Sequence, residues 1–272
     1  MTIDIGQWVL GRSLVGMTVR ILLLLYVGLN LVAFFFAEHL IFPVPFPSYQ
    51  DTPDIIKLTT RNQQRISALH LPNPNATYTI LHSHGNGSDL GSTRSVLEFI
   101  QQLGFSVFAY DYQGYGTSQG TPSEQHTYLD IDAAYEYLTQ TLKIPSDRII
   151  LYGFSVGSGP TIDLATRQSV AGVILEGAFT STFRVVTYFP ILLLDRFRNI
   201  DKIKSVQRPL LVIHGTHDRV IPFWHGKALY AAANSPKEFL PVAGADHNNL
   251  IDVAGSQYSK ALQAFAQQLK EP

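Results

Sequence analysis

Apolar and polar positions divide the chain into three parts. Residues 21–37 (ILLLLYVGLNLVAFFFA) carry no charge, and Asn30 is their only strongly polar side chain. Residues 42–54 contain four prolines, which favour an extended spacer over a helix or a central strand. Beyond this spacer, short apolar runs alternate with longer amphipathic ones. We therefore expect an N-terminal anchor and linker at 1–47 and one folded domain at 48–272.

The apolar N-terminal run has the properties of a membrane anchor. As a helix, 21–37 would span roughly 25 Å at ~1.5 Å per residue, slightly less than a bilayer core, and the apolar residues that follow can extend it. Arg12 and Arg20 precede the run, whereas Glu38 and Asp51 follow it. This asymmetry predicts a single-pass protein with a cytoplasmic N-terminus and an extracytoplasmic catalytic domain. A cleaved signal peptide and a buried or peripheral hydrophobic helix are the alternatives.

The alternating runs predict the secondary structure of the domain. Strands are expected at 55–59, 65–69, 78–82, 106–110, 148–152, 172–175, 210–214 and 238–242. Helices are expected at 90–103, 122–142, 158–166, 224–233 and 257–270. Strands that alternate with helices indicate a mostly parallel sheet covered on both faces. The first two strands have no helix between them, so they should form an antiparallel hairpin at the sheet edge.

One helix start is specified by its residue types. In GTPSEQ (120–125), Thr121 can act as the N-cap, Pro122 suits the first helical position, and Glu124 follows the cap by three residues. We therefore expect the helix at 122–142 to begin with a capping box.

Composition excludes several classes of function. The formal net charge is −1 and no long block of like charge occurs, so the chain lacks the basic footprint of a nucleic-acid-binding protein. The absence of cysteine excludes disulfides, thiolate metal sites and a cysteine nucleophile. No motif indicates a nucleotide, flavin or metal cofactor, and we expect none.

The segment LYGFSVGSG (151–159) contains the pattern G-x-S-x-G, with Ser155 between Gly153 and Gly157. A serine at a sharp strand-to-helix turn holds strained backbone angles, and small residues on either side let the strand and helix approach. A buried strand precedes the motif and a helix follows it. We therefore expect Ser155 to be a nucleophile; the alternative is a glycine-rich turn without chemistry.

Four motifs together resemble the α/β-hydrolase superfamily: HSHGNGSDLG (82–91), YDYQGYGTSQGTPSE (110–124), the G-x-S-x-G segment and HGTHDRVIP (214–222). The nearest branch is the membrane-anchored Bem46-like hydrolases, which are similar to eukaryotic depalmitoylating α/β-hydrolases. The resemblance covers about 45–268. It implies an α/β-hydrolase fold with a sheet of about eight strands, to which the residues of this chain add a preceding transmembrane helix and a short lid.

In this family the nucleophile, the acid and the histidine follow one another along the chain. Asp218 lies just beyond the predicted strand at 210–214, at the sheet edge where active sites of parallel sheets form; Glu176 is the reserve candidate. His247 lies in a loop after the last strand and is the expected general base, whereas His225 begins a helix. Asp246 precedes His247, but neighbouring residues in an extended loop point apart, so we expect Asp246 only to shape the loop.

An oxyanion hole requires two backbone amides directed at the developing alkoxide. One comes from the residue after the nucleophile, Val156, and the resemblance assigns the other to Asn86 in the loop HGNG (84–87). The pair His82 and His84 could also suggest a metal site. They end a strand, however, and no second cluster follows at a suitable spacing, so we expect no metal.

The segment 179–207 occupies the place of the family's cap and is too short for a helical cap domain. Its apolar run YFPILLL (188–194) is interpreted either as a core-facing helix or as a wall facing an acyl chain or a membrane. With the anchor, this favours a small-molecule or lipid-like acyl substrate held in ester or thioester linkage. Depalmitoylating relatives attach through cysteine-rich lipidated N-termini, which this chain lacks.

Two other functions stay open. One is a serine aminopeptidase of the same fold, for which Glu176 could anchor a substrate amine. The other is a non-catalytic membrane protein of this fold. The sequence leaves the oligomeric state undetermined.

Overall fold

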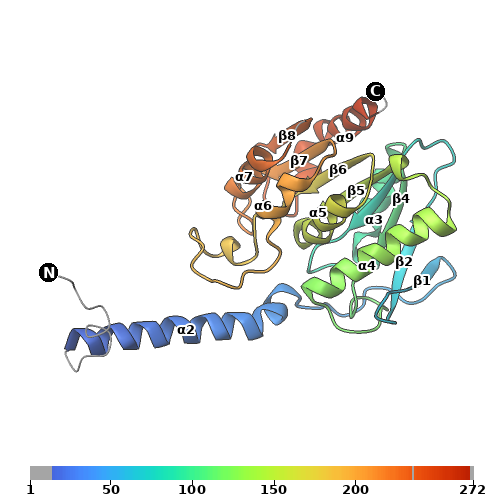
Figure 1. The fold of residues 1–272 in the computed structure, drawn as a ribbon. Coiled ribbons are helices and arrows are strands. Elements are labelled where there is room, and N and C mark those ends of the chain that lie inside the picture. Colours follow the sequence, from blue (N-terminus) through green and yellow to red (C-terminus); the bar gives the residue numbers. More distant parts are fainter. Residues whose placement is uncertain (1–13, 235, 270–272) are drawn as a thin grey trace.

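A computed structural model describes residues 14–234 and 236–269 (Figure 1). Its centre is an eight-stranded sheet in the order β1-β2-β4-β3-β5-β6-β7-β8. The strands are β1 (Ile55–Thr59), β2 (Arg65–Leu71), β3 (Thr79–Ser83), β4 (Ser106–Tyr110), β5 (Ile149–Phe154), β6 (Gly172–Glu176), β7 (Leu210–Gly215) and β8 (Lys237–Val242). β1 pairs antiparallel with β2, and β2 pairs antiparallel with β4, whereas the remaining neighbours pair in parallel. The predicted edge hairpin and parallel sheet are confirmed.

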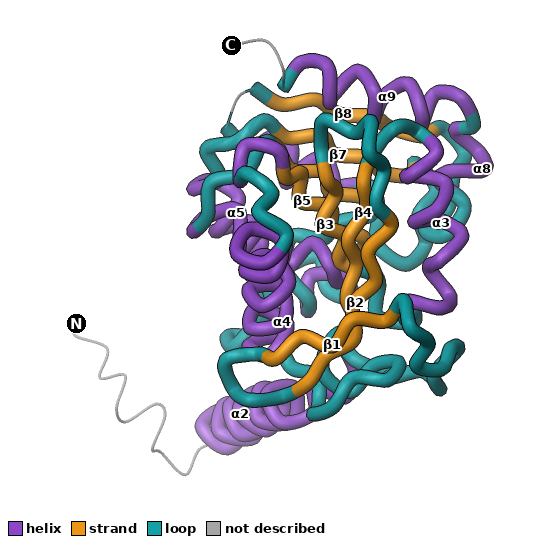
Figure 2. The backbone as a smooth tube through the Cα atoms, turned by 90° about the vertical axis from the view of Figure 1, so that its right-hand side faces the viewer, coloured by secondary structure: helices purple, strands orange, loops and turns teal. Residues whose placement is uncertain are grey.

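Helices cover both faces of the sheet (Figure 2). One face carries α3 (Leu90–Gln102), α8 (Leu250–Ala254) and α9 (Ser256–Gln268), and the other carries α4 (Glu124–Glu136), α5 (Ser158–Arg167) and α7 (Trp224–Ala232). Successive strand side chains point to opposite faces. In β5, Leu151 therefore packs with the α4 side, whereas Ile150 and Tyr152 pack with the α3 side. Burial on both faces explains why the central strands are continuous apolar runs.

The expected capping box before α4 is wrong. Ser123, not Thr121, is the N-cap: its backbone is extended and its hydroxyl accepts a hydrogen bond from the His126 amide. The side chain of Glu124 instead accepts hydrogen bonds from the Tyr128 hydroxyl and from the backbone amide of Phe197. The α-helix also ends at Glu136 and continues as a π-helical turn, so the predicted 122–142 is too long as an α-helix.

Two short helices were not predicted from the sequence, namely α6 (Asn199–Lys202) and α8. Neither is long enough to show a helical period of apolar positions. Within the folded domain, the other helix and strand ends lie within two residues of the predicted positions.

The N-terminal helix α2 (Leu14–Ile41) is longer than the predicted 21–37. Its 28 residues give a length of about 42 Å, and by length and composition it is the one helix of the described residues able to cross a membrane. Its C-terminal end packs on the domain through the buried side chains of Ala37 and Ile41, followed by Phe42. Its middle contacts the loop at 188–194 through Tyr26 and Asn30, and its N-terminal part projects away from the domain (Figure 1).

The structure of the cap segment shows that one interpretation of the apolar run 188–194, a core-facing helix, is wrong. Residues 188–194 form no helix, and their side chains are largely exposed, with Tyr188 at 72% and Phe189 at 73%. Pro190 lies in the middle of the run and lacks the amide that a helix interior needs. The run is therefore not a core-facing helix but an exposed apolar loop beside α2.

Candidate active site

Ser155 sits at a sharp turn between β5 and α5. Its φ is +53°, a left-handed conformation that is unfavourable for a residue with a side chain. A Cβ added at Gly153 would lie 2.6 Å from the Gly157 carbonyl oxygen, and one at Gly157 would overlap the Ser83 carbonyl. The turn therefore requires glycine at both flanking positions, as the motif predicts.

The fold brings the three predicted residues into one hydrogen-bonded chain. The Ser155 hydroxyl oxygen is 3.0 Å from His247 Nε2, and His247 Nδ1 is 2.7 Å from Asp218 Oδ2. Asp218 follows β7 and His247 follows β8, so the carboxyl ends of three parallel strands meet here. All three side chains are at least 93% buried. The arrangement is that of a nucleophile, a base and an acid that orients the base.

Asp218 is held in place as a carboxylate. Its Oδ1 accepts hydrogen bonds from the amides of Val220 and Ile221, at 2.9 and 2.7 Å. Burial alone would raise the pKa of Asp218, but the contacts with His214 and His247 and the Ile221 amide outweigh burial and hold it well below its usual range. Asp218 therefore carries a negative charge beside the imidazole throughout the neutral pH range.

Asp246 faces away from the imidazole. Its Oδ1 accepts the backbone amides of Arg219 and His247, and its Oδ2 accepts the Arg219 guanidinium. The Arg219 amide, the His247 amide and the guanidinium lower the pKa of Asp246 to about 2. Asp246 thus ties the loop after β7 to the loop after β8, in agreement with the predicted loop-shaping position.

Asn86 lies in the loop between β3 and α3. Its side chain donates to the Ile41 carbonyl at 2.9 Å, and its own carbonyl accepts from the Tyr115 hydroxyl at 2.9 Å. No acceptor among the described residues takes its backbone amide. Val156 is 4% exposed and directly follows Ser155 in the same helical turn. A Cβ added at Gly85, the neighbour of Asn86, would lie 3.6 Å from Ser155 Cβ, so the loop that carries Asn86 lies against the nucleophile.

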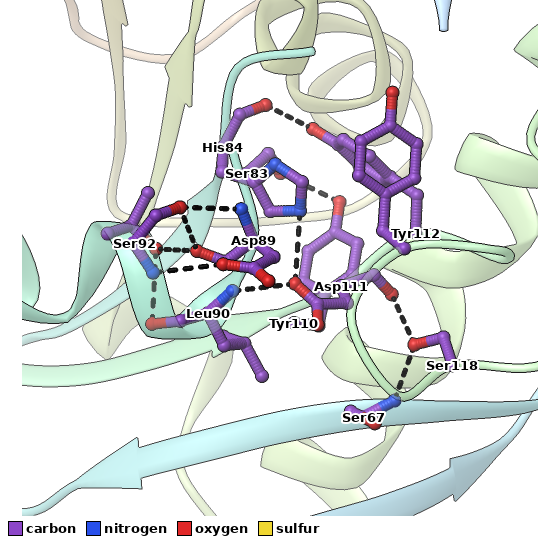
Figure 3. A network of polar contacts seen from close by, with 12 residues as sticks. Ser67, Ser83, His84, Asp89, Leu90, Ser92, Tyr110, Asp111, Tyr112 and Ser118 are labelled. Atoms are coloured by element: carbon purple, nitrogen blue, oxygen red, sulfur yellow. Dashed lines mark hydrogen bonds and ion pairs between the residues drawn. The ribbon is translucent and has the colours of Figure 1, made fainter. Parts of the chain in front are cut away.

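A buried polar network holds the loop between β3 and α3 in place (Figure 3). Asp111 accepts hydrogen bonds from the Leu90 amide at 2.8 Å and from the Tyr49 hydroxyl at 2.5 Å, and its Oδ1 lies 3.3 Å from His84 Nε2 without hydrogen-bond alignment. The Tyr112 hydroxyl donates to the His84 carbonyl at 2.6 Å. The network shows that Asp111 anchors the loop carrying Asn86.

Glu176 has a different environment from the one expected of an acid partner. Its Oε2 accepts hydrogen bonds from the hydroxyls of Tyr152 and of Tyr258, the latter at 2.6 Å. Burial raises the pKa of Glu176, and the two tyrosines partly offset this effect. Because His247 Nδ1 is bound to Asp218, Glu176 does not occupy the acid position.

Two other histidines, His225 and His82, are part of the surrounding structure. His225 is fully buried in α7, and its Nδ1 accepts the Thr180 amide at 3.1 Å. His82 stacks on Tyr152, with ring centroids 4.9 Å apart. Within 14–234 and 236–269, no group of three or more His, Asp or Glu side chains is arranged to hold a metal ion.

Known proteins share this arrangement at the level of family and fold. Residues 74–199 match the family described as serine aminopeptidase, S33. Alpha/beta hydrolase domain-containing protein 17B of Xenopus tropicalis is 41% identical over 225 residues, 80% of this chain and 77% of that protein. Alpha/beta hydrolase domain-containing protein aho-3 of Caenorhabditis elegans is 43% identical over 200 residues, 70% and 59% of the two chains.

A solved structure of an esterase from Pyrococcus furiosus superposes with a TM-score of 0.71 at 20% identity, over 83% of this chain and 97% of that one. At this identity the likeness shows the fold. The identity to protein 17B over most of both chains shows the family. This chain therefore belongs to the α/β-hydrolase superfamily, in the family of the alpha/beta hydrolase domain-containing 17 proteins, and is a serine hydrolase.

Proposed function

We propose that this protein is a membrane-tethered hydrolase that cleaves acyl esters or thioesters, with Ser155 as nucleophile, His247 as general base and Asp218 as the orienting acid. The observation that carries the proposal is the continuous hydrogen-bonded chain from Ser155 through His247 to Asp218 at the strained turn after β5. Such a chain activates a hydroxyl that is otherwise a weak nucleophile.

In the first half-reaction, Ser155 Oγ attacks the substrate carbonyl carbon while His247 Nε2 takes the hydroxyl proton. The charge that forms on the carbonyl oxygen is stabilised by the amides of Val156 and Asn86. The tetrahedral intermediate collapses when the bond to the leaving group breaks and His247 gives its proton to the departing oxygen or sulfur. Ser155 is then acylated.

In the second half-reaction, water replaces the leaving group. His247 takes a proton from the water as the water oxygen attacks the acyl carbon, and then returns the proton to Ser155 Oγ as the acid departs. Asp218 holds Nδ1–H throughout, so Nε2 is free to accept a proton at the start of each half-reaction. Besides the acyl substrate, the reaction consumes only water.

The anchor and the cap support a substrate with an acyl chain. The Tyr26 hydroxyl donates to the Ile191 carbonyl at 2.7 Å, and the Leu193 amide donates to the Asn30 side chain at 2.8 Å. Tyr26 and Asn30 lie within the apolar part of α2. A bilayer around α2 would therefore reach the exposed apolar side chains of the cap.

We further propose that α2 is a retained anchor with its N-terminal end on the cytoplasmic side. The charge asymmetry around the helix supports this orientation, and the burial of its C-terminal end in the domain core supports retention. Resistance to alkaline carbonate extraction tests the anchor. Because the native chain has no cysteine, labelling of Ser169→Cys by a membrane-impermeant maleimide in intact cells tests the side of the domain.

The nucleophile is tested with a fluorophosphonate probe. Wild-type protein and the exposed-serine control Ser169→Ala should be labelled, and Ser155→Ala should not. A chain-length series of p-nitrophenyl esters and matched thioesters, set against aminoacyl p-nitroanilides, tests the substrate class. Unlabelled wild-type protein would refute the mechanism, and faster turnover of the anilides would replace the esterase proposal with a peptidase.

A further inference from the structure

A cavity of about 470 Å³ has the His247 imidazole in its wall, and its volume falls in the range of small-molecule sites. The segment 88–99, at the start of α3, forms one side, and the segment 247–252 forms the other. Phe154, next to the nucleophile, packs against the imidazole with ring centroids 5.1 Å apart and also lines the cavity. The cavity thus borders the residue that handles the proton of the reaction.

The charged side chains that line the cavity are all acidic or histidine. Glu176 lies in its buried part and Asp252 at its exposed rim, and neither lysine nor arginine is among its lining residues. Aromatic rings of Phe99, Tyr152 and Phe154 supply much of the apolar wall. Acidic groups together with aromatic faces attract organic cations.

Two polar atoms in the buried part of the cavity have no hydrogen-bond partner among the described residues. His82 is 3% exposed and its Nδ1 has no hydrogen-bond partner, which is unusual for a buried polar atom. Burial lowers the pKa of His82 to about 3, so the ring is neutral and does not oppose a cation. Glu176 receives both tyrosine hydroxyls on Oε2, whereas its Oε1 accepts no hydrogen bond from the described residues.

We propose that this cavity is the leaving-group subsite of the hydrolase and that it takes a leaving group bearing an ammonium cation. This inference rests on the proposed function, in which His247 returns its proton to the leaving group, so that group must lie against the imidazole. A bound cation favours the ionised form of Glu176, which together with Asp252 supplies the negative charge, and the aromatic rings cover the methylene or methyl groups of the cation. The acyl chain lies on the cap side of Ser155.

Two substrates that differ only in the charge of the leaving group test whether the subsite prefers a cation. Butyrylcholine and 3,3-dimethylbutyl butyrate differ by a quaternary nitrogen in place of a quaternary carbon, so they share the acyl group and the shape of the leaving group. We expect kcat/KM to be about tenfold higher for the choline ester, as for a partly desolvated cation. The preference should weaken as salt concentration rises.

Variants of the two cavity carboxylates test whether they cause the preference for the choline ester. Glu176→Gln and Asp252→Asn should each reduce the ratio of the two kcat/KM values several-fold, whereas Glu98→Gln, which removes an exposed carboxylate on α3 outside the cavity, should leave it unchanged. If Glu176→Gln fails to fold, Asp252→Asn on the rim carries the test. All variants are first compared with p-nitrophenyl butyrate, which lacks the cation.

The outcomes separate the two proposals. If p-nitrophenyl butyrate is hydrolysed but the choline ester has no advantage, or if neither carboxylate variant changes the ratio, the subsite is wrong and the hydrolase mechanism stands. If no ester is hydrolysed and the fluorophosphonate does not label Ser155, both proposals are wrong.

Discussion

Replacing Asp218 by asparagine tests which carboxylate orients His247. Oδ1 of Asp218 accepts two backbone amides, from Val220 and Ile221, whereas Oδ2 faces His247 Nδ1. In Asp218→Asn the side-chain oxygen must stay with the two amides, because otherwise both donors, of which the Ile221 amide is buried, lose their acceptor. The new NH₂ group then points at His247 and forces Nδ1 to accept a hydrogen bond. The proton moves to Nε2, which can no longer take the proton of Ser155.

The expected loss follows from this tautomer change. The same substitution in a serine protease triad lowers kcat by about 10⁴ with the geometry intact, and we expect a loss of this order here. Asp246→Asn keeps an oxygen for the amides of Arg219 and His247 and loses only the contact with the Arg219 guanidinium. That side chain is 87% exposed, and exposed ion pairs contribute little. We expect Asp246→Asn to retain at least about a third of wild-type kcat.

The assay is kcat for p-nitrophenyl butyrate at pH 8, with thermal unfolding measured for each variant to separate lost activity from lost structure. Both variants should remain folded. If Asp246→Asn costs more activity than Asp218→Asn, the acid has been assigned wrongly. A small effect of Asp218→Asn in a folded protein would equally refute the tautomer argument.

Three other predictions concern the turn and the core. Ser155→Gly should have a higher free energy of unfolding than Ser155→Ala by about 1 kcal/mol, because only glycine relieves the positive φ; equal urea midpoints would contradict stored strain. Gly157→Ala should abolish activity and lower the melting temperature by several degrees, since its Cβ meets the Ser83 carbonyl; an active, equally stable variant would contradict this reading of the turn. Burial raises the pKa of Asp130 to about 7 against hydrogen bonds from Gln113. Its stabilising contribution is therefore full below the unfolded value near 3.9 and is lost as pH rises through about 7, so the urea midpoint should fall between about pH 4 and 7 in wild type and level off above, but should fall much less in Asp130→Asn.

Much of the architecture could be predicted from the sequence because its signals are local. Strand runs such as 106–110 are apolar throughout because both faces of the sheet are covered, and their bounds agree with the structure. The G-x-S-x-G pattern specified the turn at Ser155 because a Cβ at either glycine has no room. The order of Ser155, Asp218 and His247 placed each one after a strand, and parallel strands bring such positions to one edge.

Other features depend on contacts between distant residues. The run 188–194 is as apolar as a core segment, and only its position beside α2 shows that it is exposed. Thr121 and Ser123 are both suitable caps, and the choice followed from the engagement of Glu124 by residues far along the chain.

By itself, the sequence determined the fold class, the strained turn and the candidate nucleophile, base and acid, because each of these follows from short-range pattern and chain order. Chain order also favoured Asp218 over the adjacent Asp246 as the partner of His247, and in the structure Asp218 meets Nδ1 whereas Asp246 binds Arg219. Only the tertiary structure decided the surroundings of Glu176, since its tyrosine partners and its cavity come from β5, α3 and α9. Side-chain direction across packed elements is set by the whole fold, and no local spacing encodes it.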